Sequence, residues 1–358
     1  MYVIGSIEER LPTDAIEILA WLATEHPDPT REAWMTESNR GGRYYGGDIL
    51  ANSINTTRGR AASAIANLIL KNPLYVETFH DCLECMVKDP SICVRSSVAF
   101  ALYAVARHDK NLAFRLFEEI DFSEERLLGT HYFFHLIRLG LRDDFDRLRP
   151  FIERMLRSQY PEIAKSGACL ASLVGLHHDR SSDLIDEALT GSAPQRLGIA
   201  EVASANIGPH EFRDWCGRTL EMLFYDTDVE VRREAASSFR YLDGESLTEC
   251  DRLIESFCNS PAFADDSFSI LHAFENSKSR VPGLTCLICE KFFDRFSSEA
   301  RNIQNARAAD SPTVAKLVFK TYQQHQNDEW TTRALDLIDR MCIETLRDAK
   351  REIQEFER

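Results

Sequence analysis

Apolar residues recur along most of this chain at spacings of three and four, the pattern of helices with one buried face. Clear examples are "SVAFALYAVARH" (97–108), "KSGACLASLVGLHH" (165–178) and "TRALDLIDRMCIETL" (332–346). The alternation typical of strands is nearly absent. Prolines stand where helices are expected to break: Pro73, Pro90, Pro161, Pro194, Pro209, Pro261, Pro282 and Pro312. The pattern predicts an all-α chain with short loops.

The helical pattern also repeats. "DPSICVRSSVAFAL" (89–102) aligns without a gap with "DTDVEVRREAASSF" (226–239). The matching positions are Asp89 with Asp226, Val94 with Val231, Arg95 with Arg232, and Ala99 with Ala236. Weaker copies place the arginine slot at positions 58, 95, near 128, 164, 196 and 232. Steps of this length leave room for two helices and two turns in each repeat.

The repeat resembles HEAT repeats, in which an Asp…Val-Arg arrangement marks the second helix and aspartates and arginines of adjacent repeats often form a ladder. The resemblance implies a right-handed alpha-solenoid of HEAT-like helical hairpins. We expect an N-terminal helix and long capping loop over 1–45, repeats over 46–330, and a C-terminal capping helix over 331–358. Arg95 and Arg232 should be structural. Asn55 is the predicted N-cap of the helix that contains Arg58.

Composition narrows the classes of function. The 358 residues include 42 Lys and Arg against 57 Asp and Glu, a formal charge of −15. This acidic excess repels a phosphate backbone and disfavours nucleic acid as a partner. No apolar run approaches the roughly 20 residues that span a bilayer, and "MYVIGSIEERLP" lacks the features of a signal peptide. Ten cysteines scattered through helical segments indicate a reducing compartment, so we expect a cytoplasmic protein without a membrane partner.

Two Cys-x-x-Cys pairs, Cys82/Cys85 and Cys286/Cys289, could suggest a metal or redox site. Zinc requires four ligands, and these pairs stand about two hundred residues apart in the chain. Each pair also lies in a helical pattern, without the strand-to-helix context of a redox motif. The interpretation is buried structural thiols.

The histidine pairs carry no stronger signal. Adjacent His177 and His178 would project about 100° apart on a helix, so they predict a polar cluster at a helix end and not a chelate. His131 and His135 are four residues apart but lack the glutamate of a metalloprotease motif, which predicts a pair at the edge of the core.

Phosphate-loop motifs are also missing. We therefore expect no enzyme activity, no cofactor and no metal.

Arginines cluster in "IRLGLRDDFDRLRPFIERMLR" (137–157), where aspartates and glutamates are interleaved with them. A phosphate-binding stripe is one interpretation. Ion pairs four residues apart within one helix are the preferred one.

The segment "HPDPTREAWMTESNRGGRYYGGD" (26–48) is long for a connection between helices. It either packs over the end of the solenoid or docks a partner, because aromatic residues and arginine are enriched at binding hot spots. The candidate partner-binding residues are Trp34, Arg43, Tyr44, Tyr45 and, far along the chain, Trp330.

Four segments together resemble the C-terminal region of large bacterial STAND-type P-loop NTPases of antiviral defence: "EILAWLATEHPDP", "YYGGD", "INTTRGRAASAI" and "RALDLIDRM". The resemblance involves residues 17–65 and 333–341. In such proteins a helical-repeat sensor recognises a foreign protein and releases the NTPase to oligomerise. The resemblance implies a non-enzymatic sensor domain whose partner is a phage protein or an NTPase or effector subunit.

Two alternatives remain open. HEAT-like solenoids also occur in alkylpurine DNA glycosylases, which present a basic concave face, so a nucleic-acid-binding protein is one alternative. A passive scaffold for a partner enzyme is the other, because a scaffold needs only a solenoid with an adhesive surface.

Overall fold

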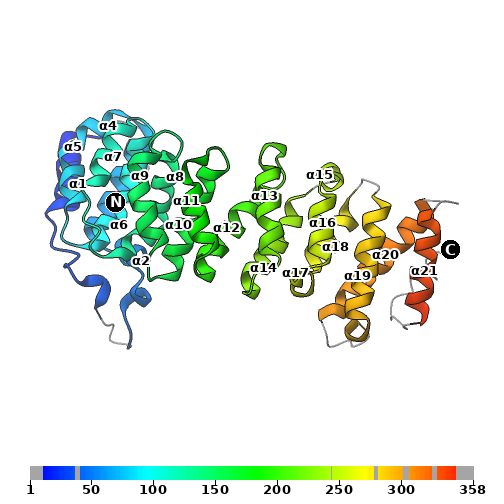
Figure 1. Cartoon of the computed structure of the whole chain (residues 1–358). Coiled ribbons are helices and arrows are strands. Elements are labelled where there is room, and N and C mark those ends of the chain that lie inside the picture. Colours follow the sequence, from blue (N-terminus) through cyan, green and yellow to red (C-terminus); the bar gives the residue numbers. More distant parts are fainter. Residues whose placement is uncertain are drawn as a thin grey trace. The chain divides into compact units, whose positions relative to one another are not determined.

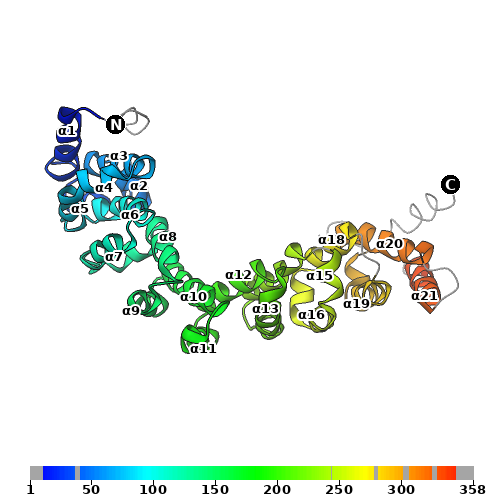
Figure 2. The same cartoon turned by 90° about the horizontal axis from the view of Figure 1, so that it is seen from above.

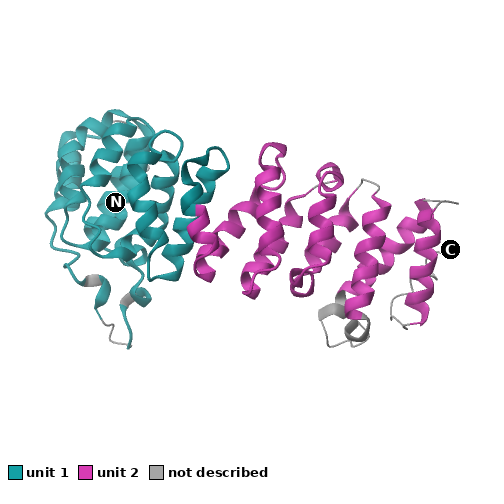
Figure 3. Ribbon diagram, in the orientation of Figure 1, with its two compact units in different colours: residues 1–184 teal, residues 185–358 magenta. Residues whose placement is uncertain are grey.

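The computed structural model describes residues 11–36, 41–242, 244–277, 281–300, 306–324 and 329–343. These residues form helices joined by turns, with no strand among them, which confirms the all-α prediction. The chain divides into two compact units, Met1–Leu184 and Ile185–Arg358 (Figure 3). Each unit is described by itself.

Unit 1 consists of successive helices joined by short turns. Its elements are α1 (Thr13–Thr24), η2 (Ala33–Met35), η3 (Tyr44–Gly47), α2 (Ile49–Ser53), α3 (Thr57–Lys71), α4 (Leu74–Thr78), α5 (His80–Val87), α6 (Ile92–Ala106), α7 (Lys110–Glu118), η4 (Glu125–Gly129), α8 (His131–Gly140), α9 (Phe145–Leu156), α10 (Pro161–Gly175) and η5 (Asp179–Ser181). Helix α11 (Ser182–Leu189) crosses the boundary between the units.

Unit 2 continues the same alternation of helices. Its elements are α12 (Ala193–Ala205), α13 (His210–Leu223), α14 (Val229–Ala236), η6 (Ser237–Tyr241), α15 (Gly244–Thr248), α16 (Asp251–Cys258), α17 (Pro261–Asp265), α18 (Phe268–Asn276), α19 (Pro282–Ala300), α20 (Ala306–Gln324) and α21 (Glu329–Ile343).

The helices of unit 1 form two layers (Figures 1 and 2). Helices α3, α6, α8 and α10 pack against one another in chain order, and we call them layer B. Helices α5, α7 and α9, called layer A, each contact a layer B helix. Helix α6 is buried along nearly its whole length, because α3, α7 and α8 all pack on it. Each pair of helices thus buries its apolar face against its neighbours.

Unit 2 has the same two-layer arrangement. Helix α12 contacts α14, and α18 contacts α20, with η6 between the two pairs. Helices α13, α16, α19 and α21 contact one another in order and pack against them. Each layer joins segments that are about one helical pair apart in the sequence.

The predicted repeat slots fall at equivalent places in this arrangement. Arg95, Ala164, Arg196 and Arg232 are each the fourth residue of their helices, which are α6, α10, α12 and α14. Arg58 is the second residue of α3. The weak copy near Leu128 falls in η4, directly before α8. The sequence frame therefore located the second helix of successive pairs correctly.

Helix α3 begins at a different cap from the predicted one. The hydroxyl of Thr56 accepts a hydrogen bond from the backbone N–H of Gly59 (3.3 Å), whereas the Asn55 amide donates back to the carbonyl of Ala51 (2.7 Å). Asn55 as the N-cap was therefore wrong, because the short α2 holds its side chain. Gly59 permits a close approach: a Cβ there would lie 2.1 Å from the carbonyl oxygen of Ser53.

Pro312 does not break a helix, contrary to the expectation. It lies inside α20, where a proline removes one backbone hydrogen bond and crowds the preceding turn. Asp310, Ser311 and Val314 beside it are buried, and the Ser267 hydroxyl donates to the Asp310 carboxylate (3.0 Å). Tertiary packing on both sides of Pro312 therefore keeps the helix continuous.

The predicted C-terminal capping helix corresponds to α21, which begins at Glu329. Residues 344–358 lie outside the described part of the chain. The N-terminal helix and loop of the predicted segment 1–45 correspond to α1, η2 and the start of η3.

Candidate partner-binding surfaces

The arginine of the first repeat slot, Arg58, links two segments in the interior of unit 1. Arg58 pairs with Asp89 through two hydrogen bonds (Nε–Oδ2 2.8 Å, Nη2–Oδ1 3.2 Å), and the two side chains are 8% and 4% exposed. The Arg58 guanidinium also donates to the carbonyls of His26 and Pro29. Arg58 thus fastens the start of the 26–48 loop to the turn before α6.

The same pairing recurs in unit 2. The Arg196 guanidinium lies 2.6 Å from the Asp226 carboxylate, and that of Arg232 lies 2.5 Å from Asp265. Arg232 also donates to the backbone carbonyl of Asp226 (2.7 Å). These contacts join successive helical pairs, which is the ladder that the repeat pattern implied.

Arg95 occupies the same slot in α6 and is buried. Its Nη1 donates to the carbonyl of Asp89 (2.7 Å), and its Nη2 lies 3.7 Å from the Asp121 carboxylate. Burial lowers the pKa of the Arg95 guanidinium, because desolvation disfavours the charged form. Like Arg232, Arg95 is placed for a structural contact, as the sequence predicted.

Trp34 of the predicted docking loop lies inside unit 1. It is 4% exposed, and the Arg126 guanidinium covers its ring at 4.3 Å from the centroid. Arg126 also lies 5.6 Å from the ring centroid of Tyr160, the residue before α10. Trp34 therefore packs the loop against η4, and proposing it as a surface anchor was wrong because its ring is covered by Arg126.

The tip of the loop presents the other candidates. Arg43 is exposed, and Tyr45 is 55% exposed with a φ of +49°, in the left-handed region that non-glycine residues rarely adopt. Tyr44 begins η3, but its side chain lies outside the described set. Arg43 and Tyr45 therefore remain accessible to a partner.

Trp330 belongs to unit 2, at the start of α21. It is half-buried: a Cβ on Gly283 would lie 3.0 Å from its ring, and the Arg333 guanidinium lies 5.4 Å from the centroid of that ring. Its main contacts are therefore with α19 and within α21. Trp330 is therefore a residue of unit 2, whereas Arg43, Tyr44 and Tyr45 of the loop belong to unit 1.

Helix α1 exposes two apolar residues that were not predicted from the sequence. Ile18 is 57% exposed and Trp21 is 47% exposed, with the Trp21 ring edge-on to His26 (5.5 Å). They flank Leu19, which is fully buried. A helical projection of 13–24 would have shown that apolar residues occur on more than one face.

Charge is distributed unequally between the layers of unit 1. Helices α3, α6 and α8 contain no aspartate or glutamate, and α10 contains only Glu162, in its first turn. Layer A contains both signs. The exposed cations on the layer B helices are Arg60, Lys71 and Arg138, whereas the turns after α6 and α8 contain both signs, Arg107 with Asp109 and Arg142 with Asp143. A chain of charge −15 thus has one layer almost free of carboxylates.

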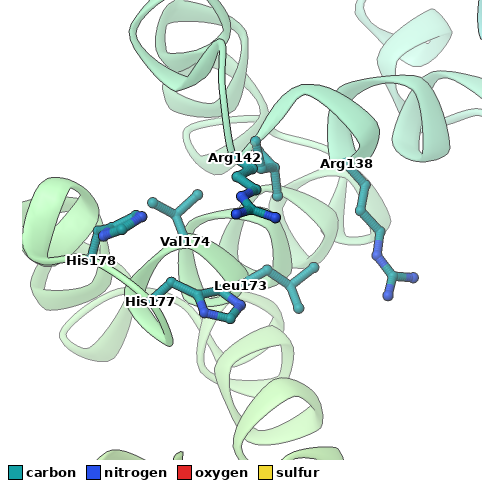
Figure 4. Close-up of a pocket in the computed structure, with 7 residues that line it drawn as sticks. Arg138, Arg142, Leu173, Val174, His177 and His178 are labelled. Atoms are coloured by element: carbon teal, nitrogen blue, oxygen red, sulfur yellow. The ribbon is translucent and has the colours of Figure 1, made fainter. Parts of the chain in front are cut away.

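A pocket opens on layer B at the C-terminal ends of α8 and α10 (Figure 4). Its volume is about 510 Å³, and its lining residues are Arg138, Leu141, Arg142, Leu173, Val174, His177 and His178. Figure 4 shows Arg142, His177 and His178 around Leu173 and Val174, with Arg138 on the side away from His178. The predicted polar cluster of His177 and His178 at a helix end therefore forms part of a cationic pocket.

Aromatic rings continue this surface along α8. The rings of His131 and His135 lie 4.2 Å apart, and Tyr132 stacks on Phe100 of α6 at 4.7 Å. Burial, with His131 and Arg138 nearby, lowers the pKa of His135, which favours its neutral form. His131 is exposed and His135 half-buried, so the pair lies at the edge of the core, as the sequence predicted.

The arginine cluster of 137–157 divides into two groups. Arg149 and Arg157 pair with Glu153 four residues away, as predicted. Arg147 pairs instead with Glu118 of α7. Within the described residues, the side chains of Arg138 and Arg142 have neither a hydrogen bond nor an ion pair, so the intrahelical interpretation was wrong for them.

The cysteines are free thiols. Cys82, Cys286 and Cys289 of the two Cys-x-x-Cys pairs are buried, and Cys85 is exposed. Burial raises the pKa of Cys82 to about 12, which suppresses the reactive thiolate. In the described parts of the chain, no three His, Cys, Asp or Glu side chains gather closely enough to hold a metal ion.

Neither a scan against protein-family models nor a search of curated proteins returned a match for this chain. The HEAT-repeat and STAND-type resemblances therefore stay predictions. Among the described helices, none combines the length and the apolar character that crossing a membrane requires.

Proposed function

We propose that this chain is a non-enzymatic helical-repeat protein that binds a protein partner on the exposed face of layer B. The proposal treats the stacked helical pairs as HEAT-like hairpins of a right-handed alpha-solenoid, an architecture whose repeated surface suits extended partners. The observation that supports it is the near absence of carboxylates from α3, α6, α8 and α10 beside exposed arginines and aromatic rings. Arg43 and Tyr45 of the loop add a second accessible contact.

The sensor of a bacterial STAND-type antiviral system is the specific form of this proposal, and it rests on the sequence resemblance alone. A reducing cytoplasmic setting suits the ten free thiols. The partner would then be a phage protein or an NTPase or effector subunit.

The test is an affinity capture from bacterial lysate, with and without phage infection, read by mass spectrometry. Three baits are compared: the unchanged chain, Arg107→Glu after α6, and Arg115→Glu on α7. Both arginines are exposed, so the two variants carry the same change of charge on different layers. A partner lost with Arg107→Glu and retained with Arg115→Glu supports the proposal. A partner retained by both variants, or no partner at all, refutes it.

Nucleic-acid binding is the second candidate, because an acid-poor surface with arginines and stacked rings also suits phosphates and bases. The overall charge of −15 opposes it. Fluorescence anisotropy with labelled single- and double-stranded DNA between about 50 and 200 mM salt decides the matter, because phosphate contacts weaken steeply over that range.

A further inference from the structure

The pocket at the C-terminal ends of α8 and α10 combines two arginines with an aliphatic floor. We propose that it binds the carboxylate of an acidic, aliphatic peptide segment of a partner protein. This inference rests on the proposed function and specifies the chemistry of the ligand.

Among the described residues, the side chains of Arg138 and Arg142 differ from their neighbours in having no hydrogen bond and no ion pair. The pKa of Asp143 is lowered chiefly by Lys110, and Arg142 lies near enough to lower it further. Arg147 and Arg149 pair with Glu118, Asp183 and Glu153. Asp143 follows Arg142 directly in the chain, but its carboxylate pairs with Lys110. Carboxylates are therefore close in sequence, yet within the described residues none forms an ion pair with Arg138 or Arg142. Two guanidinium groups are left to bind an external anion.

The negative C-terminal ends of the two helices neutralise only part of this positive charge. Arg138 lies in the last turn of α8, where a cation is favoured by the helix dipole. The C-terminal ends of α8 and α10 each present about half a negative charge. Two arginines exceed that by about one positive charge, before any contribution from His177 and His178. The surplus suits one carboxylate.

The floor of the pocket favours a peptide over a nucleic acid. Leu173 is half-buried and, with the nearly buried Leu141 and Val174 beneath, offers an aliphatic contact that suits a Leu, Ile or Val side chain next to an acidic residue. A volume of about 510 Å³ accommodates two or three side chains. Guanidinium groups match carboxylates in planar, two-bond geometry. Sequence-tolerant nucleic-acid grooves instead use a row of cations and flat aromatic platforms that track the strand.

The experiment measures fluorescence anisotropy of the full chain with three labelled probes. The probes are a peptide of four Leu-Asp-Glu repeats, its uncharged counterpart of four Leu-Asn-Gln repeats, and a twelve-nucleotide oligothymidine. The variants are Arg138→Gln/Arg142→Gln, which removes two positive charges, and Arg115→Gln on layer A, a control that removes one. All three arginines are exposed, and circular dichroism verifies that each variant folds.

We expect saturable binding of the acidic peptide below about 1 mM, a loss of at least about tenfold in the double variant, and no change in Arg115→Gln. No binding of the acidic peptide, equal binding of the uncharged peptide, equal binding by the double variant, or binding of oligothymidine alone would each overturn the inference.

The capture experiment separates this inference from the function beneath it. A partner that is lost with Arg107→Glu but retained by Arg138→Gln/Arg142→Gln leaves the proposed function standing and refutes the pocket. A partner lost with both variants and retained with Arg115→Glu supports both. A partner retained by all variants refutes both.

Discussion

Replacing Arg58 should expose how strongly the repeat arginines hold unit 1 together. Its guanidinium bonds the Asp89 carboxylate and the carbonyls of His26 and Pro29 at one buried site. Arg58→Ala leaves Asp89 as a buried charge that still accepts a hydrogen bond from the backbone N–H of Ser91 (2.7 Å). Removing one partner of a buried ion pair costs about 3–5 kcal/mol.

For a unit of this size, that loss lowers the melting temperature by about 10 °C, since each kcal/mol shifts it by about 2–4 °C. Thermal unfolding followed by circular dichroism measures the shift. Hydrogen exchange localises it, because the 26–36 segment loses the Arg58 side-chain bonds to the carbonyls of His26 and Pro29 and should exchange faster. Asp28 still accepts hydrogen bonds from the backbone N–H groups of Thr57 and residue 58 in the variant. Arg60→Ala is the matched control: Arg60 lies two residues away and is exposed, with one bond to the carbonyl of Ile54 (2.9 Å).

The double variant Arg58→Met/Asp89→Leu should recover part of the lost stability, because it removes the orphaned charge as well. The buried Arg58–Asp89 pair contributes little if the free energies of unfolding of Arg58→Ala and Arg60→Ala agree within about 1 kcal/mol. An unchanged rate of hydrogen exchange in residues 26–36 would lead to the same conclusion, and either result would refute the reasoning.

Three further predictions follow from the same structure. Arg232→Ala should destabilise unit 2 less than Arg58→Ala destabilises unit 1, because the Arg232 and Asp265 side chains are 16% and 18% exposed. Neither change should remove partner binding selectively, and a lost partner with an unchanged melting temperature would refute the structural assignment. Gly59→Ala should destabilise unit 1 by several kcal/mol, because the added Cβ would collide with the Ser53 carbonyl. Gly217→Ala in α13 is the control: its Cβ meets nothing within 4 Å, so it should stabilise the helix by about 0.5–1 kcal/mol. Denaturant unfolding compares the two variants, and equal effects would contradict the predicted close approach. Iodoacetamide at neutral pH should modify the exposed Cys85 and Cys342, whereas Cys82, Cys216 and Cys258 should react only after unfolding, as mass spectrometry can verify. Burial raises the pKa of each of these three thiols from 9.0 to about 12, so folding favours their protonated form. The free energy of unfolding should therefore fall as the pH rises from 9 toward 12, and a flat alkaline profile would contradict this.

Much of the fold was accessible from local chemistry. The helical spacing of apolar residues predicted the all-α class, and the Asp…Val-Arg frame located Arg95, Arg196 and Arg232 at the fourth position of equivalent helices. Both signals depend on contacts between residues close in sequence or one repeat apart. A side chain that must face its neighbouring helix therefore leaves a periodic mark in the sequence.

Tertiary packing decided what the pattern could not. Trp34 in a polar, glycine-rich loop has the composition of a binding anchor, but Arg126, far along the chain, covers its ring. Pro312 has the chemistry of a helix breaker, but buried residues on either side keep α20 continuous. For Pro312, tertiary packing outweighs a local preference of about 3 kcal/mol against proline inside a helix.

The candidate pocket shows the same division. The sequence placed Arg138 and Arg142 in a cluster with enough carboxylates to neutralise them. Only the structure shows that Asp143 pairs with Lys110 and Glu118 with Arg147, which leaves Arg138 and Arg142 beside His177 and His178. The sequence by itself determined the helices and the frame of the repeat. The choice of partner for each charged side chain was decided by tertiary structure, because an ion pair depends on distance in space and not on separation along the chain.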